Sequence, residues 1–212
     1  MTFKQILLCV AGLLIVFIPS ACIDLKQPGL DMQYYTLEYD APSITGYEPL
    51  PFIVRIEKFD AAPLYNSRDI IYKDREYKRG SYPYHRWMTR PADIATYMIG
   101  RDLKKSGMFK GVIMPGERNR EVSFRVSGMI EGFHELNTGR EQHGVLTVSI
   151  TLAPEAGPAK TKGMDILQKT YNAIEKMEKK SPVSLAEALS RAMQKVSHEI
   201  CIDMYGYAGR ND

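Results

Sequence analysis

Cysteine is scarce in this chain of 212 residues, and its scarcity excludes a fold that depends on disulfides. The three cysteines are Cys9, Cys22 and Cys201. Cys9 leaves with the N-terminal segment described below and Cys22 is modified, so Cys201 alone remains and no intramolecular disulfide is possible. The remaining chain is long enough for a packed core. Cys201 lies in an apparently helical segment and is expected to be a buried structural thiol.

A strong charge of one sign is also lacking. The formal net charge is +3, and basic and acidic residues alternate, as in Lys73-Asp74-Arg75-Glu76. A nucleic-acid-binding surface requires Lys and Arg concentrated on one stripe, so no nucleic-acid partner is expected. The content of 44% hydrophobic and 25% charged residues is ordinary for a globular domain.

Motifs for catalysis, metals and cofactors are missing as well. The only histidines are His85, His134, His143 and His198, and no cysteine or carboxylate forms a matching metal-ligand pair with them. His134 and His143 flank an expected turn, where solvated surface positions are favoured, and His198 is also expected in solvent. No G-x-S-x-G, P-loop or dinucleotide-binding motif occurs. The sequence therefore favours a non-enzymatic protein without cofactor or metal, although Ser81 near His85 leaves a hydrolase as a weak alternative.

Residues 1–21 predict a secretory signal peptide. Lys4 is the only charge before an apolar run of 13 residues, Ile6 to Ile18, and the small residues Ser20 and Ala21 follow. A membrane-spanning helix needs about 20 apolar residues, whereas the core of a signal peptide needs roughly 7–15. The run is thus short enough to indicate export rather than a membrane span.

Cys22 stands at the end of this segment, and Ser20-Ala21-Cys22 resembles the lipobox of bacterial lipoproteins. The resemblance implies cleavage before Cys22 and acylation of the cysteine with fatty acids such as palmitate. Pro19 departs from the pattern, which usually has an aliphatic residue there. Ile23, in place of the Asp that retains lipoproteins in the inner membrane of enteric bacteria, favours the outer membrane. An ordinary signal peptide with a coincidental cysteine and an uncleaved anchor are the alternatives.

The rest of the chain is expected to be a tether, residues 22–33, one domain, residues 34–205, and a frayed tail, residues 206–212. Alternating or β-branched residues predict strands at 34–39, 52–57, 69–73, 121–127 and 145–152. Residues 75–90 are expected to form an arm or loop. A helix is expected from Pro91 to the cap at Ser106-Gly107, and another from a capping box at Ser184-Leu185-Ala186-Glu187.

Residues 164–178 fit either a helix or a strand, and a strand through Tyr171 is favoured. These elements indicate an α+β fold: a single compact domain with an antiparallel-rich sheet and two principal helices packed on it.

The segment Arg79-Gly80-Ser81-Tyr82-Pro83-Tyr84-His85-Arg86-Trp87 combines aromatic residues, arginines and the only tryptophan. Aromatic residues and Arg dominate interface hot spots, so an interface with a partner or another protomer is expected here. The residues expected in it are Tyr82, Tyr84, His85, Arg86 and Trp87. The alternative is that Trp87 and the tyrosines cover the core beside the following helix.

Several motifs in order resemble the family of ABC-type transport auxiliary lipoproteins. They are Tyr34-Tyr35-Thr36-Leu37, Asp69-Ile70-Ile71-Tyr72, Tyr82 to Trp87, Arg90-Pro91, Ser106-Gly107-Met108-Phe109 and Leu185 to Met193. The likeness covers roughly residues 34–205, and the basic stretch Lys73 to Arg79 departs from it. It implies a non-enzymatic lipoprotein on the periplasmic face of the outer membrane. The implied partners are an MCE-domain protein that spans the periplasm, its ABC permease system and further copies in an oligomer, and the implied cargo is lipid.

Two other functions remain open at this stage. A periplasmic lipid-binding carrier or chaperone would hold an acyl chain in an apolar cavity of the domain itself. A periplasmic hydrolase would use Ser81 or a histidine. The auxiliary lipoprotein is favoured over both.

Overall fold

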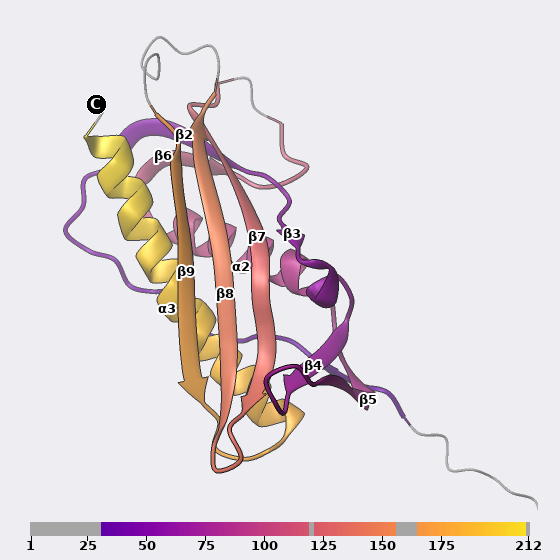
Figure 1. The fold of residues 1–212 in the computed structure, drawn as a ribbon. Helices are drawn as coiled ribbons and strands as arrows, with labels where there is room; N and C mark the ends of the chain where they lie inside the picture. The colour runs from indigo at the N-terminus through magenta and orange to yellow at the C-terminus, as the bar shows by residue number, and fades with distance from the viewer. Residues whose placement is uncertain (1–30, 119–120, 156–164, 211–212) are drawn as a thin grey trace, which may run out of the picture. The chain divides into compact units, whose positions relative to one another are not determined.

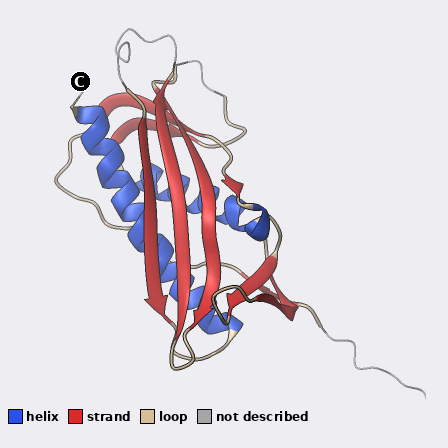
Figure 2. Cartoon of the chain, viewed as in Figure 1, coloured by secondary structure: helices blue, strands red, loops and turns tan. Residues whose placement is uncertain are grey.

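Nine strands form one mixed sheet within the part of the chain that the computed structural model describes, residues 31–118, 121–155 and 165–210 (Figures 1 and 2). The strands are β1 Gln33–Tyr35, β2 Leu50–Ile56, β3 Asp60–Ala61, β4 Asp69–Lys73, β5 Arg79–Trp87, β6 Phe109–Ile113, β7 Phe124–Asn137, β8 Gln142–Pro154 and β9 Leu167–Lys176. The helices are η1 Pro63–Tyr65, α2 Pro91–Ser106 and α3 Pro182–Gly209. The folded unit spans Met32–Asp212, and the expected signal peptide and Cys22 lie outside the described residues.

The three longest strands form an antiparallel meander, β7–β8–β9. The β7–β8 turn contains Gly139, which adopts the left-handed φ of 87° that only glycine accepts at little cost. The other edge of β7 is shared by β2, β3 and β4, each parallel to it over two or three residues. The sheet therefore forks at β7: one branch continues from β2 to β6, and the other from β4 through β5 to β1.

Both α-helices cover one face of this sheet, behind the strands in Figure 1. Alternate residues of β8, Leu146, Val148 and Ile150, are buried on that face. The helix α3 packs closely, because a Cβ added to Gly144 would lie 3.1 Å from the Cβ of Ala188. The core is thus a two-layer α+β arrangement, and the sequence-based prediction of the fold class is confirmed.

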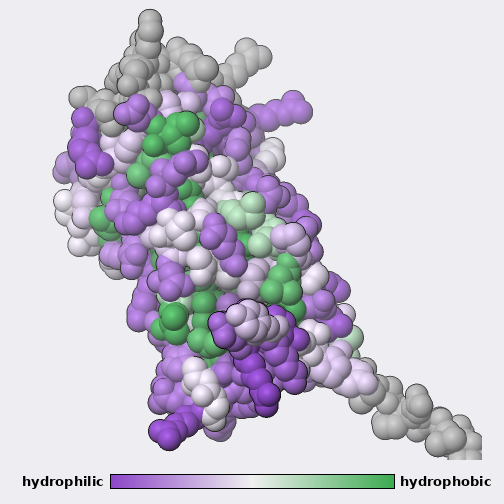
Figure 3. Space-filling view, viewed as in Figure 1, coloured by the Kyte–Doolittle hydropathy of each residue, from purple (hydrophilic) through white to green (hydrophobic). Residues whose placement is uncertain are grey.

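The opposite face of the sheet is open and largely hydrophilic, with separate hydrophobic patches (Figure 3). Polar side chains on neighbouring strands are hydrogen-bonded across it: Thr147 Oγ1 donates to Asn172 Oδ1 at 2.9 Å, and the Ser149 and Thr170 hydroxyls lie 2.7 Å apart. These pairs satisfy the hydroxyls and tie β9 to β8 on the face that no helix covers.

The helix α2 has the boundaries that its sequence predicts. Pro91 occupies the first turn, and Gly107 closes the helix with a left-handed φ of 67°. The favoured strand at 164–178 is also confirmed as β9, in which Tyr171 is buried between β8 and α3. Tyr171 Oη donates to Asp203 Oδ2 at 2.9 Å, which joins the strand to the helix.

Three local expectations are wrong. The arm at 75–90 contains the strand β5, because β4 and β1 pair with its two edges. The N-cap of the last helix is Ser181, three residues before the expected N-cap Ser184, and its side chain accepts a hydrogen bond from Ser184 N at 3.2 Å. The tail from 206 is helical through Gly209, because Tyr207 and Ala208 are buried in the core.

Candidate partner-binding site

The strand β5 turns a corner in the middle of the segment that the sequence marks as an interface. It pairs with β4 at Arg79–Ser81 and again at Arg86, with a register shift between the two positions. Bulges of this kind bend a strand and redirect its side chains. Pro83 lies within the bulge and donates no backbone hydrogen bond, which suits an edge position.

Arg86 holds this corner in place. Its Nη1 donates to the carbonyl oxygens of Tyr82 at 2.9 Å and His85 at 3.0 Å, and its Nε lies 3.1 Å from Asp69 Oδ1 on β4. Most of the donors of the guanidinium are thus bound within the chain. Arg86 therefore stabilises the bulge, and its side chain is 26% exposed.

Aromatic rings gather on the inner side of the corner. Tyr82 packs edge-on against Tyr72 at 5.4 Å and against His85 at 5.9 Å between ring centroids. Tyr35 of β1 joins them, with its hydroxyl 2.8 Å from His85 Nδ1. Gly80 makes room for this packing, since a Cβ there would lie 2.4 Å from the Tyr72 ring. The cluster fixes the rings that form the wall of a pocket.

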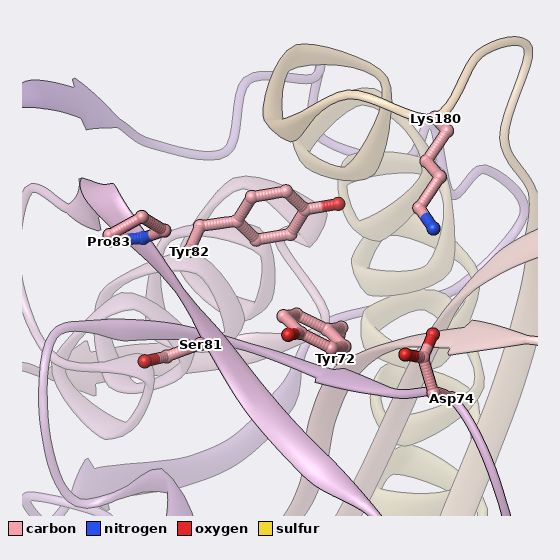
Figure 4. A pocket seen from close by; sticks show the side chains of 6 residues that line it. All are labelled: Tyr72, Asp74, Ser81, Tyr82, Pro83 and Lys180. Atoms are coloured by element: carbon pink, nitrogen blue, oxygen red, sulfur yellow. The ribbon is translucent and has the colours of Figure 1, made fainter.

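That pocket has a volume of about 250 Å³ and is open to solvent (Figure 4). Its lining residues are Tyr72, Asp74, Ser81, Tyr82, Pro83 and Lys180. Lys180 comes from the segment just before α3 and extends its amine toward the tyrosines and Asp74 (Figure 4). The pocket therefore offers two aromatic rings, one proline, one amine and one carboxylate, a combination that suits a peptide segment with both apolar and polar groups.

A buried carboxyl group contacts one wall of the pocket. Glu135 on β7 is fully buried, and its Oε2 accepts a hydrogen bond from Tyr82 Oη at 2.6 Å. Its Oε1 has no hydrogen-bond partner within the described part of the chain. Burial raises the pKa of Glu135, while the Tyr82 hydrogen bond and Lys180 oppose this rise. The same contact anchors the Tyr82 ring, because breaking it leaves a carboxylate unsatisfied in the core.

The five residues expected at an interface differ in their exposure to solvent. Tyr84 is 42% exposed, whereas Tyr82 and His85 are partly buried in the aromatic cluster. Trp87 is completely buried and packs edge-on against Phe133 at 5.0 Å between ring centroids. The expectation that Trp87 contacts a partner is therefore corrected, because its indole belongs to the hydrophobic core.

Three residues of the pocket were not predicted from the sequence. Tyr72 lies in β4, and Asp74 lies in the turn after it. Recognition of the hairpin formed by β4 and β5 would have placed both residues beside Tyr82. Lys180 is separated from Tyr82 by almost one hundred positions, and nothing near it in the sequence marks it.

The histidines lie in different surroundings. His134 stacks on Tyr65 at 5.8 Å between centroids and its Nδ1 lies 3.0 Å from Tyr65 Oη, so the expected surface position is wrong. Burial and the nearby Arg79 and Lys73 lower the pKa of His134 to about 4. His198 is exposed as expected. Across residues 31–118, 121–155 and 165–210, no group of three or more His, Cys, Asp or Glu side chains is arranged to hold a metal ion.

Two further observations bear on the sequence-based expectations. Cys201 is buried, and burial raises the pKa of its thiol to about 12, as expected for a structural cysteine. No helix among the described residues is long and apolar enough to cross a membrane.

Comparisons with known proteins agree with the resemblance seen in the sequence. A family model described as "ABC-type transport auxiliary lipoprotein component" matches residues 35–201. A search of curated proteins gives no match. The solved structure of protein XCC0632 from Xanthomonas campestris, assigned to the DUF330 family model, is similar with a TM-score of 0.73 and 12% identity, over 84% of this chain and 98% of that one. An uncharacterized protein is similar with a TM-score of 0.62 and 11% identity, over 82% and 99% of the two chains. At these identities the structural likeness concerns the fold alone.

Proposed function

The chain belongs to the family of ABC-type transport auxiliary lipoprotein components, and from this membership we propose that it is a non-enzymatic docking part of an envelope lipid transporter. Its auxiliary role in ABC-type transport follows from the family. The proposal adds that acylated Cys22 holds it to the periplasmic face of the outer membrane. It also adds that its partner is an MCE-domain protein that bridges the periplasm, with the ABC permease system at the other end.

The pocket between β5 and Lys180 is the observation that carries the docking role. It is formed by a rigid corner, since Arg86 and the Glu135–Tyr82 hydrogen bond hold its wall before any partner arrives. Preorganised aromatic and charged groups of this kind bind a partner with little loss of conformational entropy. Tyr84 follows Pro83 in β5 and is exposed, so it is included in the proposed contact area.

The two clefts found among residues 31–118, 121–155 and 165–210 give the alternative of a lipid-binding carrier less support. The pocket at β5 has about 250 Å³, and a second cleft between β1 and α3 has about 300 Å³. Ligand pockets typically have about 300–1,000 Å³ and bury most of the ligand surface. Both clefts are open, and charged residues line them: Asp74 and Lys180 in the first, Glu38 and Glu187 in the second. An acyl chain would remain largely in water in either one.

The experiment that tests docking is crosslinking of the full-length lipoprotein in its native envelope, followed by purification and mass spectrometry. A photo-crosslinking residue at Tyr84 is expected to capture an MCE-domain protein. The same residue at Tyr97, an exposed tyrosine on α2 that is 59% accessible, is the matched control and is expected to capture much less. Capture of other copies alone would support an oligomer and count against this docking site.

A charge-reversal variant sharpens the assignment of the pocket. Lys180→Glu replaces the amine beside Asp74 by a second carboxylate, and Lys180 is exposed, so the fold should be retained. Recovery of the partner is expected to fall several-fold. The comparison is made well below the melting temperature of the variant, because Lys180 no longer lowers the pKa of the buried Glu135. Equal recovery of the partner by this variant and by the wild type would place the docking surface elsewhere on the domain.

A further inference from the structure

Three apolar or amphipathic side chains are exposed where the chain enters the domain. They are Met32, Tyr34 and Met88, with exposed fractions of 38%, 46% and 53%. Tyr34 belongs to β1, and Met88 follows β5 and donates its backbone N–H to the Tyr35 carbonyl at 2.7 Å. The residues are therefore neighbours on one local surface, although Met88 is more than fifty positions away in the chain.

Arg68 completes this surface. Its guanidinium lies over the Tyr34 ring at 5.4 Å from the centroid, and its Nη1 donates to the Met88 carbonyl at 3.3 Å. Asp69, which follows Arg68 in the chain, is paired with Arg86 at 3.1 Å, and Glu38 and Glu187 line the cleft that Tyr34 borders. The β1 surface, defined as Met32, Tyr34, Arg68 and Met88, thus combines exposed apolar groups with a cation.

This combination has the chemistry of a water–lipid boundary. Tyrosine rings favour the headgroup level of a bilayer, because the ring is apolar and the hydroxyl remains hydrated. A basic residue near anionic lipid headgroups is attracted to them electrostatically. Exposed methionines add apolar area that adapts to an irregular surface. A phospholipid surface meets all of these preferences at once.

Covalent connectivity brings a lipid surface within reach of these residues. Ten residue steps separate Cys22 from Met32, and a fully extended chain of that length spans at most about 35 Å. A bilayer that holds acylated Cys22 therefore lies within that chain length of the β1 surface. The covalent link raises the effective concentration of the membrane at this face, so even a weak contact is populated.

We propose that the β1 surface rests on the headgroup region of the membrane that anchors Cys22, and that this contact fixes the orientation of the domain. The inference depends on the acylation of Cys22 included in the proposed function. It goes further than that function by assigning one side of the domain to the membrane. This assignment fixes the orientation of other surfaces, such as the pocket at β5, relative to the bilayer.

Site-specific labelling of the full-length acylated chain in vesicles of phosphatidylethanolamine and phosphatidylglycerol tests this inference. Met88→Cys carries an environment-sensitive fluorophore, and Ile174→Cys is the control, since Ile174 is 52% exposed on β9, at the opposite edge of the sheet. Cys201 is buried and does not compete for the label. Nitroxide-bearing lipids are expected to quench the Met88 label at least about two-fold more than the Ile174 label, and Arg68→Glu should reduce that difference.

The outcomes separate this inference from the proposed function. Acylation by mass spectrometry and flotation with the vesicles establish anchoring independently of the labels. If the chain is anchored and both labels are quenched to the same extent, the β1 surface does not face the membrane, while the proposed function stands. If the Met88 label is shielded from aqueous iodide without quenching by lipid, a protein covers it and the inference fails. If Cys22 is not acylated and the chain does not float, anchoring and the inference fail together.

Discussion

Replacing Trp87 by Ala is expected to destabilise the domain and to leave partner contacts intact in the molecules that remain folded. The indole is completely buried and packs against Phe133. Truncation of a buried Trp or Phe to Ala typically costs about 3–5 kcal/mol, because apolar contacts are lost and a cavity remains. In a domain of this size, 1 kcal/mol shifts the melting temperature by about 2–4 °C. The expected decrease is therefore on the order of 10 °C.

Trp87→Phe sharpens this prediction. The indole Nε1 is buried without a hydrogen-bond partner in the described structure, so phenylalanine removes an unsatisfied polar group and retains a ring against Phe133. The two effects oppose each other, and the net cost should remain below about 1.5 kcal/mol.

Circular dichroism during denaturation by guanidinium measures these changes, because Trp87 is the only tryptophan and its fluorescence is lost in both variants. Tyr84→Ala is the surface control from the same strand and should change the unfolding free energy by less than about 0.5 kcal/mol. A midpoint for Trp87→Ala equal to that of the wild type, or a larger loss for Tyr84→Ala, would refute the assignment of Trp87 to the core.

Three further predictions concern buried groups and glycines. The pKa of His134 lies near 4 in place of its usual 6.5. The contribution of His134 to the free energy of unfolding is therefore fully present above pH 6.5 and decreases by up to about 3 kcal/mol as the pH falls toward 4. Denaturation curves of His134→Gln should lack this decrease. The pKa of Glu135 is raised from 4.5, so its contribution is present below pH 4.5 and is lost as the pH rises through the folded-state pKa; Glu135→Gln should gain stability relative to the wild type over that range. Gly144→Ala places a methyl group 3.1 Å from Ala188 and should lower the melting temperature by an amount equivalent to about 1–3 kcal/mol, whereas Gly206→Ala meets nothing within 4 Å and should stabilise α3 by about 0.5–1 kcal/mol. Equal melting temperatures for the two glycine variants would contradict the packing described for α3.

Local signals allowed the sequence to predict part of the fold correctly. The boundaries of α2 follow from Pro91 and Gly107, whose backbone preferences act within a single turn of helix. Alternation predicted the strand at 145–152, which lies within β8, and the strand at 121–127, which overlaps only the first residues of β7. The rest of β7 was missed, because a bulge between Ile130 and Gly132 changes which of its faces is buried. The start of α3 was placed three residues late, because Ser181 and Ser184 are both suitable N-caps. Pro182 at the first helical position, the same local signal as Pro91 in α2, favours Ser181.

The candidate site depended on long-range contacts and was predicted only in part. The sequence marked Tyr82 and Tyr84 through composition, yet alternation gave no warning that Trp87 at the end of the same strand is buried. The register shift in β5 explains this failure, because it changes which side chains point inward. Glu135 and Lys180 reach the pocket through the pairing of β4 with β7 and the position of α3, which no local pattern encodes.

The bend in β5 also affects how copies of the chain can associate. The short strand β1 covers only His85–Trp87, so the outer edge of β5 from Arg79 to Tyr84 has no strand beside it in the described structure. With the anchoring proposed above, copies of the chain share one membrane plane and meet often, and an open, straight edge would favour the addition of strands from neighbouring copies. Pro83 removes a donor from that edge and the bulge bends it, so side-by-side aggregation through β5 is disfavoured where the local concentration is highest.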